Sequence, residues 1–103
     1  MALLQAYEIP ARPEFDIQLP QGAQVISFYN LEDKPYIGVL VDIAARSREP
    51  RYFSMVELRA TLDTTKLERL VGVAVFRKGQ NPLHLFERKR PEVVELKVVG
   101  SAA

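Results

Sequence analysis

The most constraining feature of this chain is a succession of strand-like segments between residues 14 and 41. The first segment alternates polar residues with three apolar ones, Phe15, Ile17 and Leu19. Because side chains in a strand repeat every two residues, these three share one face. Residues 20–22 break the run, and two apolar stretches then flank a polar loop at residues 31–35. The pattern predicts a β-hairpin within a β-rich fold.

Strand-forming composition recurs along the rest of the chain. Runs rich in β-branched and aromatic residues predict strands at residues 7–9, 14–19, 23–30, 36–43, 51–56, 70–76, 83–88 and 93–99. We expect 23–30 to pair antiparallel with 36–43, which is apolar on both faces and belongs at the centre of its sheet. Segment 70–76 reads as a buried strand, 44–50 as an exposed loop and 77–82 as a hairpin loop. The fold class is mainly β, a small antiparallel β-barrel or β-sandwich of about 6–8 short strands.

Helix competes with strand only between residues 57 and 69. The leucines there are loosely spaced, so the periodicity predicts no long helix. Asp63 is suited to cap one or two helical turns near residues 64–69, because a carboxylate accepts hydrogen bonds from the free N–H groups of a first turn. We therefore expect one short helical segment.

Length and composition fit a single globular domain over residues 1–103, with residues 88–103 as a C-terminal extension strand and frayed tail. Hydrophobic content of 48% and charged content of 26% are ordinary for a globular protein, and no apolar run is long enough to cross a membrane. The first residues have no basic side chain before their apolar pair, unlike a secretory signal. The sequence predicts a soluble, cytoplasmic protein with no membrane partner.

Absent residue types exclude several chemistries. The chain has no cysteine, which removes disulfides, thiolate catalysis and cysteine-based metal sites. Its single histidine leaves no histidine pair for a metal, and its five glycines stand singly, without a phosphate-binding loop. We therefore predict no catalytic residue, no metal site, no cofactor and no enzymatic activity.

Two further groups of residues bear on catalysis and metal binding. His84 faces opposite Leu83 and Leu85, and to act as a general base it would need Asp42 or Glu87 beside it. Magnesium binding would require several carboxylates to converge, and the candidates are Asp16, Asp42, Asp63 and Glu87. A lone histidine without a nucleophile is more often a packed or surface residue. Structural roles are the ones we expect for both groups.

Basic residues cluster at three places in the sequence. They are Arg46, Arg48 and Arg51, then Arg77 and Lys78, and finally Arg88, Lys89 and Arg90. If they met on one face near tyrosines, they would form a groove for single-stranded nucleic acid on a barrel of the oligonucleotide-binding kind. The net charge is only +1, however, and glutamates interleave with the arginines. We favour a solvated surface of mixed sign.

Several short motifs resemble a known family. They are Tyr7-Glu8-Ile9-Pro10, Phe15-Asp16-Ile17, Leu19-Pro20-Gln21-Gly22-Ala23, Lys34-Pro35, Leu40-Val41-Asp42 and Leu83-His84-Leu85-Phe86-Glu87. Over about residues 7–87 the chain is similar to a family of small uncharacterised bacteriophage and prophage proteins, catalogued as a domain of unknown function. It departs from that family in the longer, charged segment 56–69 and in Gly38, where the family often has tryptophan. The resemblance implies a phage origin and a β fold, and it adds no catalytic residue.

The function expected from these observations is binding rather than catalysis. Two candidate edge strands, at residues 7–9 and 93–99, offer backbone groups for strand addition by a partner protein or by a second copy of the chain. The residues expected to contact the added strand are Tyr7, Ile9, Val94, Leu96 and Val98. Nucleic-acid binding and sequestration of a small ligand are the alternatives. The leading prediction is a non-enzymatic, phage-type accessory protein that binds a host or phage protein.

Overall fold

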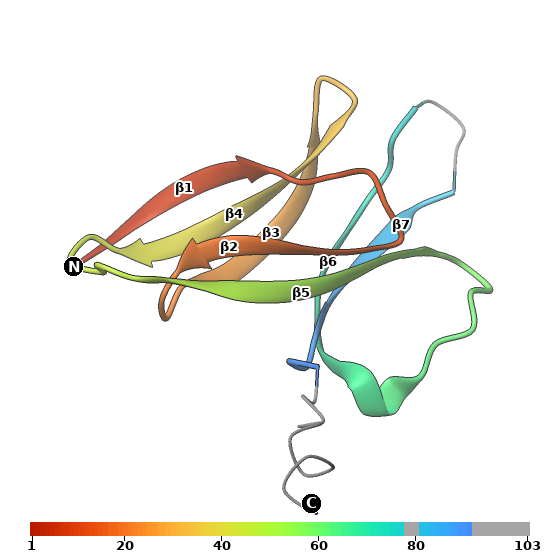
Figure 1. Ribbon diagram of the computed structural model, residues 1–103. Helices are drawn as coiled ribbons and strands as arrows, with labels where there is room; N and C mark the ends of the chain where they lie inside the picture. Colours follow the sequence, from red (N-terminus) through yellow and green to blue (C-terminus); the bar gives the residue numbers. More distant parts are fainter. Residues whose placement is uncertain (78–80, 92–103) are drawn as a thin grey trace, which may run out of the picture.

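The computed structural model describes residues 1–77 and 81–91, whose regular secondary structure is almost wholly antiparallel strands (Figure 1). In chain order the elements are β1 (Ala2–Glu8), β2 (Glu14–Pro20), β3 (Gln24–Leu31), β4 (Lys34–Asp42), β5 (Arg48–Glu57), the 3-10 turn η1 (Thr64–Lys66), β6 (Leu67–Ala74) and β7 (Leu83–Arg88). They form a three-stranded sheet, β1-β4-β3, and a four-stranded sheet, β2-β5-β7-β6. The expectation of a mainly β fold is confirmed.

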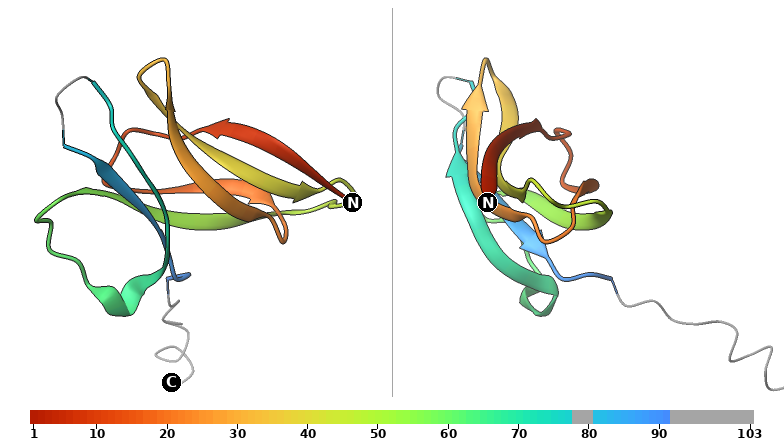
Figure 2. Two further views of the ribbon diagram at one scale, coloured as in Figure 1. Left: turned by 180° about the vertical axis from the view of Figure 1, so that it is seen from behind. Right: turned by 90° about the vertical axis from the view of Figure 1, so that its left-hand side faces the viewer.

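The two sheets curl around a shared core but do not close into a barrel (Figure 2). β3 and β6 lie side by side with no backbone ladder between them, and we call this contact the seam. β1 and β2 are outer strands of different sheets, joined by a connector at residues 9–13. The arrangement leaves each of these two strands with one unpaired edge.

The β3–β4 hairpin follows directly from its sequence. Glu32 and Asp33 both have positive φ, 54° and 63°, as in the two-residue turns that match the twist of paired strands. The Asn30 side-chain oxygen accepts a hydrogen bond from the Asp33 N–H at 2.7 Å, which stabilises the turn. β4 lies between β1 and β3, which confirms the central position expected for it.

Several expected strand boundaries are wrong. β1 begins at Ala2 rather than Tyr7, because its whole length pairs with β4. β5 begins at Arg48, inside the expected loop, because residues 48–50 pair with the end of β2. β6 begins at Leu67 and is mostly exposed rather than buried, since it is an outer strand with one face toward solvent.

The expected short helical segment is present as a single 3-10 turn. The predicted cap is confirmed, because the Asp63 carboxylate accepts hydrogen bonds from the Thr65 N–H at 3.1 Å and from its hydroxyl at 2.6 Å. These bonds lower the pKa of Asp63. The strand expected at residues 93–99 lies outside the described residues.

The core lies between the sheets and is built from the inward faces of their strands. Its largest fully buried side chains are Phe53, Leu19, Ile37, Leu85, Val25 and Val39. The rings of Phe15 and Phe53 stack across the β2–β5 pair, with centroids 5.4 Å apart. Phe15 and Leu19 are buried and Ile17 packs against the same core, which confirms the predicted apolar face of this segment.

A buried carboxylate organises the seam. Glu87 is 6% exposed and lies on the inner face of β7, opposite Phe53. Its carboxylate accepts a hydrogen bond from Arg51 Nε at 2.5 Å and lies 3.5 Å from the Arg69 guanidinium. The hydrogen bond to Glu87 raises the pKa of Arg51. We call Arg51, Arg69 and Glu87 the seam cluster.

The arginines of the seam cluster also bind the backbone at the start of β3. Arg51 Nη1 donates to the Ala23 carbonyl at 2.6 Å, and the Arg69 guanidinium donates to the Val25 carbonyl. Carbonyls without a ladder partner need another donor when they are removed from water. The two guanidinium groups therefore supply part of the hydrogen bonding that a ladder between β3 and β6 would otherwise provide.

Gly72 allows the strands of the seam to approach closely. A Cβ at this position would lie 3.3 Å from both the backbone nitrogen and the Cβ of Phe28. Backbone atoms cannot turn aside as the end of a flexible side chain can. Beyond this contact, the Asn30 side-chain amide donates to the Val75 carbonyl at 2.9 Å. The seam therefore combines a close backbone contact with side-chain hydrogen bonds.

Removing the buried carboxylate should weaken the whole fold. Glu87→Ala leaves Arg69 without its carboxylate and Arg51 with only Glu49, 3.8 Å away. We expect the free energy of unfolding in urea to fall by about 2–4 kcal/mol. Glu68→Ala, which removes an exposed carboxylate from β6, is the matched control and should change it by less than about 0.5 kcal/mol. Equal stability of the Glu87→Ala variant and the wild type would contradict the role given to the seam cluster.

Adding a methyl group at the seam should also lower the stability of the fold. Gly72→Ala forces a methyl group against Phe28, and we expect a loss of about 1–3 kcal/mol in the same urea measurement. Val73→Ala, at the neighbouring exposed position, should cost less than about 1 kcal/mol. A neutral Gly72→Ala variant would show that β3 and β6 do not depend on this close approach.

Candidate protein-binding edge

β1 forms the outer edge of the three-stranded sheet and is open to solvent along its length. Six of its seven residues are exposed, and Tyr7 is half-buried. Leu3 and Leu4 are 48% and 61% exposed. β4 pairs with one side of the strand, so the other side presents unpaired backbone groups. An edge of this kind can accept an additional strand.

Two hydrogen bonds identify the backbone groups of β1 that face outward. The Ile9 N–H donates to the Pro35 carbonyl at 3.0 Å, and the Ile43 N–H donates to the Met1 carbonyl at 3.3 Å. Bonded pairs alternate with unbonded pairs in an antiparallel ladder, so the odd-numbered residues of β1 bond to β4. The N–H and C=O groups of the even-numbered residues point away from the sheet. We call these the open-edge residues, Ala2, Leu4, Ala6 and Glu8.

Two hydrogen bonds likewise identify the outward backbone groups of β2. The Met55 N–H donates to the Pro13 carbonyl at 2.8 Å, and the Gln21 N–H donates to the Ser47 carbonyl at 2.9 Å. The outward residues of β2 are therefore Glu14, Asp16, Gln18 and Pro20. Charged side chains and proline are features that protect natural sheet edges from pairing. β1, with three small or apolar open-edge residues, is the less protected edge.

The residues predicted for the edge are not the ones that face outward. Tyr7 lies in β1, but its backbone is bonded toward β4 and its side chain packs against the core. Ile9 is buried beyond the end of the strand. Val94, Leu96 and Val98 lie outside the described residues. The sequence pattern does not reveal the open-edge residues, because the adjacent leucines, Leu3 and Leu4, hide their period of two.

The predicted basic residues are divided among separate parts of the fold. Arg46 and Arg48 lie at the end of β4 and the start of β5, whereas Arg77 lies at the opposite end of β4, beside its turn. There the Arg77 N–H donates to an Asp33 carboxylate oxygen at 2.8 Å, and its guanidinium lies 3.6 Å from the other oxygen. Lys78 lies outside the described residues. Arg77 is therefore held apart from Arg46 and Arg48.

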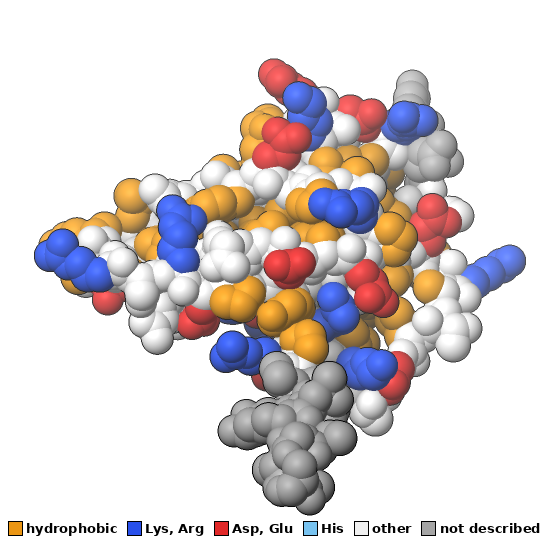
Figure 3. Space-filling view, viewed as in Figure 1, with side chains coloured by type: hydrophobic (Ala, Val, Ile, Leu, Met, Phe, Trp, Pro, Cys, Tyr) orange, Lys and Arg blue, Asp and Glu red, His pale blue; other side chains and the backbone are white. Residues whose placement is uncertain are grey.

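The remaining basic residues do lie together, but among carboxylates. Arg51, Arg88, Lys89 and Arg90 surround a hollow of about 200 Å³ that is also lined by Glu49, Glu68 and Glu87. The Arg88 guanidinium lies 3.5 Å from the Glu14 carboxylate and donates to the Phe53 carbonyl at 3.2 Å. Figure 3 shows the same mixture, with basic and acidic side chains interspersed over the visible face. Nearby carboxylates offset much of this positive charge.

His84 and the candidate carboxylates are held apart. His84 lies opposite Val56 and Val73 on the outer face of β7, whereas Glu87 points inward. Asp42 ends β4 in the other sheet, where its carboxylate accepts a hydrogen bond from the Ala44 N–H at 2.9 Å. Within residues 1–77 and 81–91, no group of three potential metal ligands is present.

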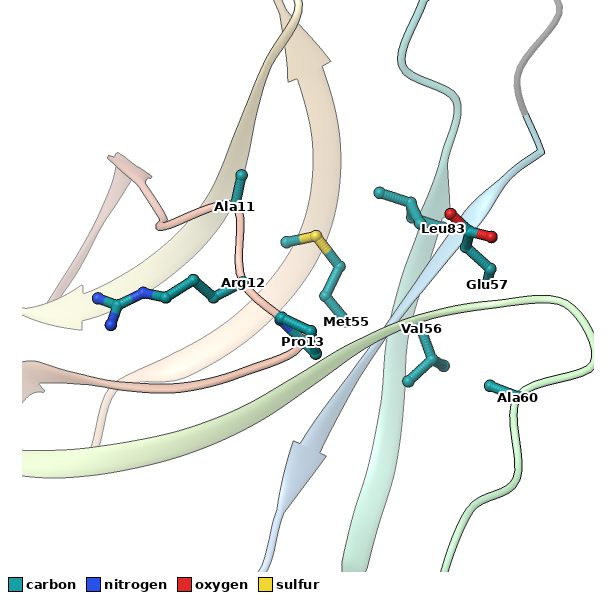
Figure 4. A pocket seen from close by; sticks show the side chains of 8 residues that line it. All are labelled: Ala11, Arg12, Pro13, Met55, Val56, Glu57, Ala60 and Leu83. Atoms are coloured by element: carbon teal, nitrogen blue, oxygen red, sulfur yellow. The ribbon is translucent and has the colours of Figure 1, made fainter.

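A largely apolar groove lies beside the connector between β1 and β2 (Figure 4). Its volume is about 410 Å³, and its lining residues are Ala11, Arg12, Pro13, Met55, Val56, Glu57, Ala60 and Leu83. A smaller hollow of about 190 Å³ adjoins it and shares Ala11, Met55 and Leu83. The sequence did not predict this groove, because its walls come from segments that are far apart in the chain.

Two proline substitutions test the direction of the β1 backbone groups. Ala6→Pro removes an N–H that faces solvent, so the free energy of unfolding in urea should change by less than about 1 kcal/mol. Gln5→Pro removes an N–H bonded to β4 and should cost at least about 2 kcal/mol. Equal losses in the two variants, or a larger loss for Ala6→Pro, would contradict the assignment of the open-edge residues.

Comparisons with protein-family models, with curated proteins and with solved structures find no match to this chain. No helix in the described part of the chain is both long and apolar enough to cross a membrane. The resemblance to a phage family therefore stays a prediction.

Proposed function

We propose that this protein binds other proteins by accepting an extended segment along β1. The observation that carries the proposal is the difference between its two free edges. Two carboxylates and Pro20 protect the outward side of β2, whereas three of the four open-edge residues of β1 are alanine or leucine. A partner strand can therefore approach β1 without burying several like charges.

The open-edge residues provide the hydrogen bonds for such a partner. Each of the four offers one N–H and one C=O, and a net contribution of about 0.5–1.5 kcal/mol per bond is typical in water. Ordering of the partner segment opposes part of this gain. We therefore expect backbone pairing to give modest affinity, with additional affinity and specificity coming from side chains.

Side chains on both faces of β1 are available to the partner. Leu4 projects from the outer face of the sheet beside Gly38, and it lies between two small residues, Ala2 and Ala6. Leu3 projects from the other face and is half-exposed. Small residues allow a partner strand with β-branched or aromatic side chains to lie close to the sheet. An added strand would extend the smaller sheet on the side where the two sheets are open.

The proposed role requires no catalytic group, metal ion or cofactor. We therefore propose a non-enzymatic accessory protein that acts in the cytoplasm through contacts with a host protein, a phage protein or a second copy of the chain. Nucleic-acid binding has less support, because the basic residues are divided and several are paired with carboxylates. The phage origin is supported by the motif resemblance alone.

Selection from a displayed library of random linear peptides tests this proposal. We expect the enriched peptides to alternate polar residues with β-branched or aromatic ones, because an added strand has that period. Isothermal titration with synthetic copies should show affinity about tenfold or more weaker for Ala6→Pro than for the wild type, since an outward N–H is lost and a ring is placed on the edge.

Gln18→Pro is the matched control for this experiment. It removes an outward N–H from β2 instead of β1, so peptide affinity should equal that of the wild type. Enriched peptides that bind Ala6→Pro as tightly as the wild type would contradict the proposal. So would peptides whose binding is lost in Gln18→Pro and kept in Ala6→Pro, because β2 would then be the binding edge.

A further inference from the structure

We infer that the groove beside the connector receives one bulky apolar side chain of the same segment that pairs with β1. The inference rests on the proposed function of β1 and adds a sequence preference to it. The occupant is an extended peptide segment with an aromatic or large aliphatic anchor residue beyond the paired part. An acidic residue lies between the paired part and the anchor.

The groove lies where a partner strand would leave β1. Glu8 is the last residue of the strand, and residues 11–13 of the connector form one wall of the groove. Figure 4 shows this connector passing from the end of β1 to the space in front of Met55 and Leu83. A strand rises about 3.3 Å per residue, so a partner needs only a few residues beyond Glu8 to reach the groove.

The floor of the groove suits an apolar anchor. Met55 is 8% exposed and Leu83 is half-buried, and both side chains point toward the connector (Figure 4). The adjoining hollow continues this surface with Phe76 and Pro35. A volume of about 410 Å³ is ample for one aromatic side chain, and the flexible Met55 thioether can adapt to its shape. Anchors of this kind often carry much of the binding energy at protein interfaces.

The charges at the groove set the expected order of residues in the partner. Arg12 projects from the connector away from Met55 and Leu83, on the side where β1 lies (Figure 4), and it forms no ion pair with the described residues. Glu57 lies on the opposite side (Figure 4). A partner passing from β1 into the groove meets the guanidinium first, so we place its acidic residue before the anchor.

Filling the groove tests the inference without changing β1. Ala60 is exposed and lines the groove, and its side chain points toward Val56 (Figure 4), so Ala60→Trp places an indole within the groove. The probes are peptides selected on the wild type and the same peptides with the anchor replaced by alanine. We expect Ala60→Trp to weaken the anchored peptides about tenfold or more and to leave the alanine versions unchanged. Ala44→Trp, at an exposed alanine after β4, should affect neither.

A second variant tests the role of the Arg12 charge. Arg12→Gln should weaken peptides that carry the acidic residue about threefold and remove the salt dependence of their binding. Peptides with an amide in place of that acid should bind Arg12→Gln and the wild type equally. If Ala60→Trp fails to fold, Ala11→Trp fills the same groove from the connector.

The two proposals fail in different ways. If Ala6→Pro weakens binding but Ala60→Trp and Ala11→Trp do not, the groove inference is overturned and the role of β1 stands. If groove filling weakens binding but Ala6→Pro does not, the link between groove and edge is overturned together with the proposed function. Weakening by both kinds of variant, with no effect of Ala44→Trp, is the result that we expect.

Discussion

The structure depends on a seam made by side chains where a backbone ladder is missing. β3 and β6 lie side by side, but the Glu87 carboxylate and two arginines supply the directional contacts between the sheets at one end of the seam. Gly72 allows the close approach farther along. Breaking one of these interactions would leave a buried charge without its partner, which lowers stability strongly. We therefore expect the seam to hold the two sheets in one arrangement. This arrangement determines which strands remain unpaired.

The free edges follow from that constraint. With β3 and β6 facing each other, the strands at the other ends of the two sheets, β1 and β2, keep one unpaired side each. They differ in protection: β2 carries outward carboxylates and Pro20, and β1 carries mainly alanine and leucine. The connector that joins them also forms a wall of the apolar groove. The edge and the groove are thus adjacent because the chain passes from one sheet to the other at this point.

Local patterns predicted the parts of the fold that depend on neighbouring residues. The alternation of Phe15, Ile17 and Leu19 indicated a buried face, and Asp63 indicated a cap. The sheet that each strand joins depends on distant contacts, which periodicity does not encode. Arg51 illustrates the limit for the candidate site: its sequence neighbours place it in a basic group suited to nucleic acid, but its partner Glu87 lies 36 positions away. The open-edge residues can be identified only from the pairing register of β1 with β4. The groove is formed by three stretches that are far apart in the chain, residues 11–13, residues 55–60 and Leu83.

Amide hydrogen exchange along β1, followed by NMR, shows whether its outward backbone groups accept a partner strand. In the isolated protein, the amides of Leu3, Gln5 and Tyr7 should exchange slowly because they bond to β4, whereas those of Leu4, Ala6 and Glu8 should exchange rapidly. Saturation with a selected peptide should slow the second set. Outward amides that exchange at the same rate with and without a saturating peptide would contradict strand addition at β1.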